Sequence, residues 1–134
     1  MSIFIYRMLK NATWGIHITF DLEEKASIKD DKYVTISNEL SIDLSMLIYL
    51  TEAQKWYIIK AFESISHYIP KDSLVIKLNK IVYNPVDYQD EGLFCGIVEW
   101  AAKQYNFTIP EFDIVFDKKH NRYNFSNIPL FNNR

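Results

Sequence analysis

Few residues of this chain combine a type and a spacing that could carry acid–base, nucleophilic or metal chemistry. The three histidines, His17, His67 and His120, are far apart in the sequence. A metal site needs ligands that converge on one point, and these side chains are expected in a strand, at a helix end and in a turn. We therefore expect no metal site, and nothing in the chain suggests a cofactor.

The remaining reactive side chains lie in one stretch, and each has a structural explanation. Cys95 falls inside a helical pattern between two glycines, which is typical of a small core residue and not of an activated nucleophile. Asp87 stands where an N-cap would start that helix. Asp90 and Glu91 are adjacent, so their carboxylates would not face each other on a helix. The sequence predicts no catalytic residues, and we expect that the protein is not an enzyme.

Two other features favour binding to another protein. A charged segment, expected to be a solvent-exposed loop from residue 21 to residue 32, carries a cluster of carboxylates that would steer a basic partner. Tyr88 stands at the start of the helical pattern, and an exposed tyrosine near a loop is a common anchor of protein interfaces. The candidate partner-binding residues are Asp21, Glu23, Glu24, Asp30, Asp31 and Tyr88.

Length, composition and charge narrow the class of protein. The chain has 134 residues, 49% of them apolar, and a formal net charge of -2. Such a chain is expected to fold around a real core, and the slight negative charge makes nucleic acid an unexpected partner. No stretch is long and apolar enough for a membrane span, and residues 1–9 lack a secretory signal. We expect a cytoplasmic protein with no membrane partner.

The strands that must position these residues are predicted from alternation. Apolar and polar side chains alternate along several stretches, which is typical of strands with one buried face. In the segment 74–83 the alternation changes phase at Asn79 and Lys80, which a β-bulge would explain. The expected strands are a hairpin of 3–9 with 13–20, then 33–36, the first half of 39–50, 74–83, and a second hairpin of 112–116 with 123–125.

Two helices are predicted, at about 51–67 and 87–105. The first begins with a capping box, Thr51-Glu-Ala-Gln54. The second contains Gly92 and Gly96, which share one helix face. A glycine inside a helix costs roughly 1 kcal/mol relative to alanine. We therefore predict that this face lies very close to a neighbouring element.

Residues 50–105 resemble domain IV of translation elongation factor G. The signature of that family runs Tyr-His-x-Val-Asp-Ser-Ser-Glu-x-Ala-Phe-x-x-Ala directly after a strand. The matching residues are Tyr83, Val86 and Asp87, with Asp90, Gly92, Leu93 and Gly96 in place of its Glu, Ala, Phe and Ala. The departures are Asn84, Tyr88 and Gln89, which stand where the family has a histidine and two serines.

This resemblance implies a four-stranded sheet with two helices on one face, in a non-catalytic domain whose tip loops probe the ribosomal decoding region. Together with the periodicity, it predicts an α+β fold. We expect a single sheet of four or more strands with two helices packed side by side on one face. One domain should span residues 1–125, followed by a loose polar tail at 126–134.

Three functions remain open at this point. The first is a non-catalytic immunity protein that neutralises a bacterial toxin by binding it, and the partner would be a basic toxin domain. The second follows from the resemblance and is a ribosome- or RNA-associated protein, with Lys118, Lys119 and Arg122 as a basic turn. The third is a small enzyme whose site the sequence does not reveal.

Overall fold

A mixed sheet of five strands forms the centre of the fold. The computed structural model describes residues 2–10, 13–26, 32–69 and 74–128. The strands are β1 (Ser2–Met8), β2 (Ile16–Ala26), β3 (Val34–Thr35), β4 (Leu40–Asp43) and β5 (Leu74–Tyr83). They lie in the order β1–β2–β5–β4–β3, with β4 and β5 parallel and all other neighbours antiparallel. The predicted hairpin of the first two strands is confirmed.

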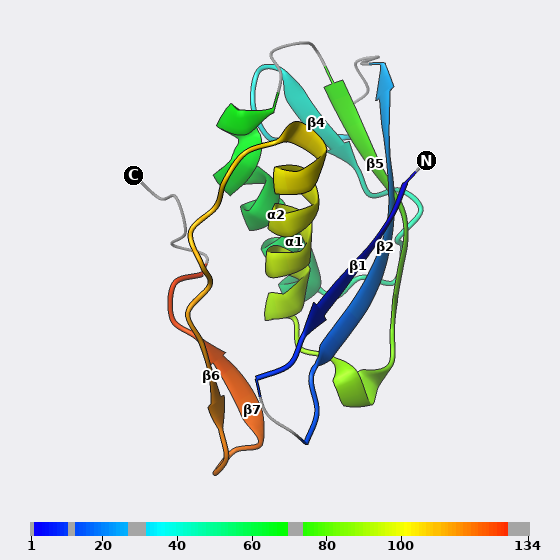
Figure 1. Ribbon diagram of the computed structural model, residues 1–134. Helices are drawn as coiled ribbons and strands as arrows, with labels where there is room; N and C mark the ends of the chain where they lie inside the picture. The colour runs from blue at the N-terminus through cyan, green and yellow to red at the C-terminus, as the bar shows by residue number, and fades with distance from the viewer. Residues whose placement is uncertain (1, 11–12, 27–31, 70–73, 129–134) are drawn as a thin grey trace.

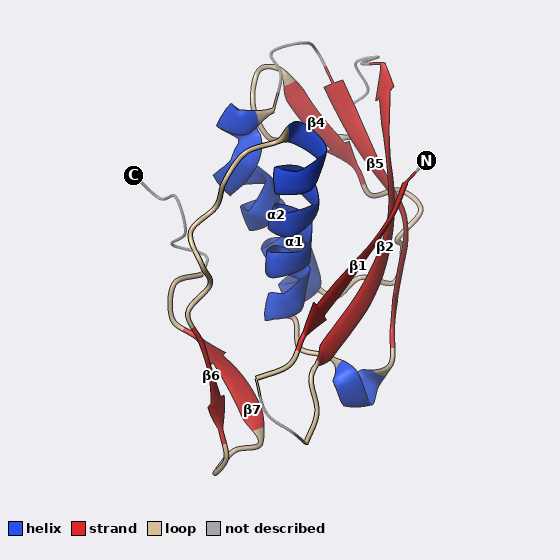
Figure 2. Cartoon of the chain, viewed as in Figure 1, coloured by secondary structure: helices blue, strands red, loops and turns tan. Residues whose placement is uncertain are grey.

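Two helices lie against each other on one face of this sheet (Figure 2). They are α1 (Glu52–Ile65) and α2 (Glu91–Tyr105), and both begin at the end of the domain to which β5 runs. A separate antiparallel hairpin, β6 (Ile114–Asp117) and β7 (Arg122–Phe125), lies at that same end (Figure 1). The predicted α+β class is confirmed, and so is the second hairpin.

Alternation along the strands produces the core, as the sequence predicts. Even-numbered residues from Tyr6 to Met8 on β1 and from Ile16 to Leu22 on β2, among them Ile18 and Phe20, are buried beneath the helices. The predicted β-bulge is also confirmed. The register of β2 against β5 shifts between Asp21 and Leu22, which pair with Lys80 and Leu78, so that Asn79 is the extra residue. After the bulge, odd-numbered residues of β5 face the core.

β2 is longer than the sequence suggests, and the expected loop from residue 21 is wrong for its first part. Asp21, Glu23 and Glu24 lie within the strand, which pairs with β5 as far as Ala26 opposite Leu74. Ladder hydrogen bonds to β5 hold this segment extended although its side chains are charged, because a strand with one solvated face accepts polar residues there. Asp30 and Asp31 lie outside the described residues.

The close approach predicted at the two glycines is confirmed, and the neighbouring element is the sheet. A Cβ atom on Gly92 would lie 2.8 Å from Ile16 Cγ2 on β2. One on Gly96 would lie 2.6 Å from Cζ of the Phe20 ring. These distances are shorter than any normal carbon–carbon contact, so the two glycines allow α2 to pack directly onto β2. This face of α2 is turned towards the strands and not towards α1.

The starts of the two helices differ in how well the sequence predicts them. The capping box of α1 is confirmed, because Gln54 N donates to Thr51 Oγ1 and Thr51 N donates to Gln54 Oε1, both at 3.0 Å. The predicted N-cap role of Asp87 is wrong. Asp87 ends a short 3-10 turn that begins at Pro85, and α2 starts only at Glu91.

Proline favours the first position of a helical turn, and here it starts a separate turn. The extended backbone of Tyr88, with φ -146° and ψ 141°, then interrupts the helical path. Asp90 occupies the N-cap position of α2, and its carboxylate accepts a hydrogen bond from the Tyr88 hydroxyl.

The start of the predicted tail is attached to the domain. Ser126 N donates to Asp113 O at 3.1 Å, and the Asn127 side chain bonds Asp113 N and Glu111 O. Ile128 packs against the core. Residues 129–134 lie outside the described part of the chain.

Candidate protein-binding face

The sheet has one face that the two helices and the β6–β7 hairpin leave uncovered (Figure 1). We call it the open face. Because even-numbered residues of β1 and β2 point into the core, odd-numbered residues point to the open face. Three aliphatic side chains on it are well exposed to solvent: Ile3 by 60%, Ile5 by 45% and Val82 by 50%.

The strand register gathers these aliphatic side chains. Ile5 pairs with Thr19, and Thr19 pairs with Val82, so the three residues form one row across β1, β2 and β5. In the next row Ile3 pairs with Asp21, which pairs with Lys80. An aliphatic row therefore borders a charged row, which is the arrangement of a protein-binding patch with a polar rim.

A shallow depression continues the aliphatic row towards the end of β5. Its volume is about 290 Å³, and it is lined by His17, Thr19, Val82, Tyr83, Asn84 and Asp87. This volume is at the lower limit for small-molecule sites, which are usually enclosed and largely apolar. An open depression of this kind suits a single side chain of a protein partner.

The predicted acidic residues are divided between the two faces of β2. Asp21 and Glu23 are on the open face, where Glu23 Oε1 accepts from Asn79 Nδ2 at 2.8 Å. Asp21 Oδ1 is buried and has no hydrogen-bond partner among the described residues. Glu24 is on the helix side and accepts a hydrogen bond from the Tyr105 hydroxyl, whose pKa is raised by burial and by this carboxylate. The open face therefore gathers two of the predicted carboxylates and not Glu24.

Tyr88 lies in a polar network at the start of the helices. Its ring stacks on Tyr83, with centroids 3.7 Å apart. Gln54 Nε2 donates to both hydroxyls, at 3.0 Å and 3.1 Å, and the Tyr88 hydroxyl donates to Asp90 Oδ1 at 2.7 Å. Burial and the neighbouring Asp90 carboxylate raise the pKa of Tyr88 above its ordinary range. The Tyr88 hydroxyl is already satisfied, so its contribution to binding would come from its ring.

Sequence reasoning missed the aliphatic residues of the open face. The available signal was the absence of alternation in two places, because Ile3 to Tyr6 and Ile81 to Tyr83 are apolar at every position. A strand that is apolar on both parities has a second face to cover. The partly buried ion pair on the open face, between Lys25 Nζ and Asp43 Oδ2 at 3.0 Å, was also missed. It depends on strands that are distant in the sequence.

The histidines do not come together. His17 lines the depression, His67 stacks on Tyr68, and His120 Nδ1 lies 2.7 Å from Asp117 Oδ2. In the described ranges, no group of three His, Cys, Asp or Glu side chains could hold a metal ion. Cys95 is fully buried, and burial raises the pKa of its thiol, so the sulfur stays protonated at neutral pH.

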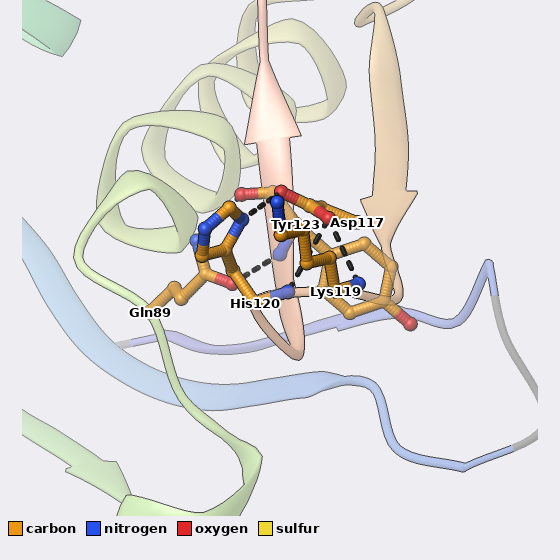
Figure 3. A network of polar contacts seen from close by, with 5 residues as sticks. All are labelled: Gln89, Asp117, Lys119, His120 and Tyr123. Atoms are coloured by element: carbon orange, nitrogen blue, oxygen red, sulfur yellow. Dashed lines mark hydrogen bonds and ion pairs between the residues drawn. The ribbon is translucent and has the colours of Figure 1, made fainter.

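The β6–β7 hairpin is held to the domain by Gln89 (Figure 3). The Gln89 amide accepts from Tyr123 N at 2.6 Å and donates to Tyr123 O at 2.9 Å, as a neighbouring strand would. In the turn, Asp117 Oδ1 accepts from Lys119 N and His120 N. These hydrogen bonds fix the conformation of the turn between β6 and β7.

The basic turn carries less free positive charge than its sequence suggests. Arg122 Nη2 lies 3.1 Å from Glu91 Oε2, and this ion pair neutralises one of the predicted cations. The His120–Asp117 contact lowers the pKa of the Asp117 carboxyl, which therefore stays ionised beside the turn. Lys118 and Lys119 are exposed. With Arg122 paired to Glu91, two lysines beside the Asp117 carboxylate make a weak electrostatic site for a polyanion.

The buried position of Glu99 on α2 predicts how the stability of the protein depends on pH. Burial raises the pKa of its carboxyl, so the ionised carboxylate destabilises the folded state at pH values above that pKa. This destabilisation disappears when the pH is low enough for the carboxyl to be protonated in both the folded and the unfolded state. Glu99→Gln should therefore unfold at higher urea than wild type at pH 7. The difference should shrink as the pH falls through the raised pKa of Glu99 and should be gone below the ordinary glutamate pKa of about 4.3.

The control for this prediction is Glu39→Gln, because Glu39 is an exposed residue outside the core. Urea midpoints of both variants would be compared with wild type across the same pH series. A Glu99→Gln advantage that is the same at pH 4 and pH 7 would contradict the assignment.

Comparison with protein families, curated proteins and solved structures finds no match to this chain. The resemblance to domain IV of elongation factor G therefore stays a prediction. Among the described helices, none has the length and apolar character needed to cross a membrane.

Proposed function

We propose that this protein acts without catalysis, by binding another protein through the open face of its sheet. The observation that carries the proposal is the aliphatic row of Ile5, Thr19 and Val82 beside the carboxylates of Asp21 and Glu23. The partner class that we propose is a basic bacterial toxin domain. The protein would then be an immunity protein acting in the cytoplasm.

The physical argument assigns different tasks to the two kinds of side chain. Burial of aliphatic groups contributes roughly 25 cal/mol for each Å² removed from water, so Ile3, Ile5 and Val82 would hold the complex. Carboxylates at the border change mainly the association rate and the choice of partner. Asp30 and Asp31 follow β2 in the sequence and would add to this steering.

The alternative of a ribosome- or RNA-associated protein has less support. It depends on the resemblance to domain IV of elongation factor G and on a basic turn in which Arg122 is paired with Glu91. A polyanion partner would need a basic surface. The third function, a small enzyme, has no group of side chains that supports it among the described residues. Both alternatives are outcomes of the experiment below.

The test requires a search for a secreted effector gene next to this one, followed by titration calorimetry of the toxin domain that such a gene encodes. Val82→Arg places a long charged side chain in the aliphatic row, next to the depression, and should weaken binding at least about tenfold, or 1.4 kcal/mol. Val115→Arg is the matched control, because Val115 is 61% exposed on β6, away from the open face. Its affinity should equal that of wild type.

Added salt and charge-reversed variants test whether the carboxylates steer the association with the partner. The association rate should fall with added salt, and Asp30→Lys/Asp31→Lys should lower it further. Equal affinity of Val82→Arg and wild type would contradict binding through the open face. Co-purification with ribosomes, or turnover of a metabolite, would replace the proposed class.

A further inference from the structure

β1 is an edge strand whose outer side has no neighbour in the sheet. It is the first strand in the order β1–β2–β5–β4–β3, and seven residues long. Among the described residues, no loop or turn makes a backbone hydrogen bond to Ser2–Met8. Natural proteins protect such edges with lysine, proline, bulges or covering loops. The sequence of β1, Ser-Ile-Phe-Ile-Tyr-Arg-Met, has one charge and no proline.

We propose that β1 pairs with β1 of a second copy of this chain, antiparallel and centred on Ile5, so that the two sheets become one. The register follows from the two-fold symmetry of such an interface. Ile5 lies opposite Ile5 of the second copy, Ile3 lies opposite Arg7, and Phe4 lies opposite Tyr6. The exposed Ile3 and Ile5 of both copies then form one aliphatic stripe on the joined open face.

The charged residues near this edge favour pairing of β1 with a second copy of the chain over pairing with an unrelated strand. Ile3 pairs with Asp21 within each copy. In the proposed register, Arg7 of the second copy would therefore lie in the same row as Asp21, two strands away. Two strand spacings are about 10 Å between Cα atoms, which an arginine can cross over the Ile3 side chain. Asp21 Oδ1 has no hydrogen-bond partner among the described residues and would gain a cation nearby.

On the side of the sheet that carries the helices, the surface beside β1 is also left uncovered. A groove of about 190 Å³ runs beside it, lined by Ser2, Ile3, Phe4, Trp100, Lys103 and Gln104. Trp100 is only 4% exposed, and its indole N–H has no hydrogen-bond partner in the described part of the chain. A strand added to β1 would cover this groove, so both sides of the edge have surface for a second copy to bury.

The experiment is sedimentation equilibrium of the purified chain over a wide range of concentrations. Wild type should be a dimer at high concentration. Ile5→Glu should be monomeric at the same concentrations, since two carboxylates would face each other on the symmetry axis. Val82→Arg is the matched control: it lies on the open face but two strands from the edge, and it should dimerise like wild type.

Charge reversal tests the register. Arg7→Glu and Asp21→Arg should each weaken the dimer at least about tenfold, a change typical of a lost charge pair at an interface. The double variant should recover most of that loss. Circular dichroism would confirm that each variant is folded.

A wild-type chain that is still monomeric at about 1 mM would overturn the proposal. Its dimer would then be held by less than about 4 kcal/mol of association free energy. A dimer that Val82→Arg disrupts and Ile5→Glu does not would also overturn it. The inference does not rest on the proposed toxin partner, because that function is tested at Val82 and the dimer at Ile5.

Discussion

Replacing Gly96 with leucine should lower the free energy of unfolding by about 3 kcal/mol or more, at or above the upper end of the usual range for overpacking. The first added carbon would already lie 2.6 Å from Cζ of Phe20, a ring that is completely buried. Because the ring is enclosed in the core, we expect α2 to move away from β2 to make room for the leucine. Urea unfolding followed by tryptophan fluorescence measures the loss.

Three further variants make this test specific. Gly92→Ala should cost less than Gly96→Ala, because its nearest contacts, Ile16 Cγ2 at 2.8 Å and Ile18 Cδ1 at 2.9 Å, are longer than the contacts of Gly96 with the Phe20 ring. Lys103→Leu places the same leucine side chain at an exposed position of α2 and should be close to wild type. A Gly96→Leu protein as stable as Lys103→Leu would mean that α2 does not pack directly onto the sheet.

Replacing Tyr123 with alanine should cost about 3–5 kcal/mol, the range for deleting a large buried aromatic side chain. Tyr123 is fully buried on β7. Its ring packs edge-on against Trp14, with centroids 5.0 Å apart, and against Phe116 at 4.9 Å. Its hydroxyl donates to Trp14 O and accepts from Lys10 N. The side chain therefore joins the β6–β7 hairpin to the segment that connects β1 and β2.

Tyr123→Phe separates the ring from the hydroxyl. It keeps the packing but leaves Trp14 O without its donor, which should cost roughly 1–3 kcal/mol. Asn124→Ala, at an exposed position on the same strand, is the control. Thermal and urea unfolding of the three variants would be compared. If Tyr123→Ala is as stable as Asn124→Ala, the hairpin contributes little to the fold.

The sequence predicts the parts of this fold that depend on neighbouring residues. Alternation identifies β5 and the bulge at Asn79, and the capping box at Thr51 sets the start of α1. The Asp87 prediction failed because Pro85 starts a turn of its own before α2. The length of β2 was underestimated because pairing with β5, which is distant in the sequence, holds charged residues in a strand.

The candidate site was harder to predict for the same reason. Asp21 and Glu24 are close in the sequence but lie on opposite faces, which follows only once the segment is known to be a strand. The exposure of Val82 depends on the helices lying on the other face. The bonds from Gln54 to Tyr83 and Tyr88 likewise join segments that are far apart in the chain.

We propose that the open face binds the toxin domain, and a methyl NMR titration would show which side chains the partner contacts. Isotope-labelled isoleucine and valine methyl groups would be observed while the proposed partner, the toxin domain of an effector found in a neighbouring gene, is added. Chemical shifts of Ile3, Ile5 and Val82 should change the most. Val115, which is 61% exposed on β6 away from the open face, should not change. Changes confined to Val115, with the open-face methyl groups unaffected, would contradict the account.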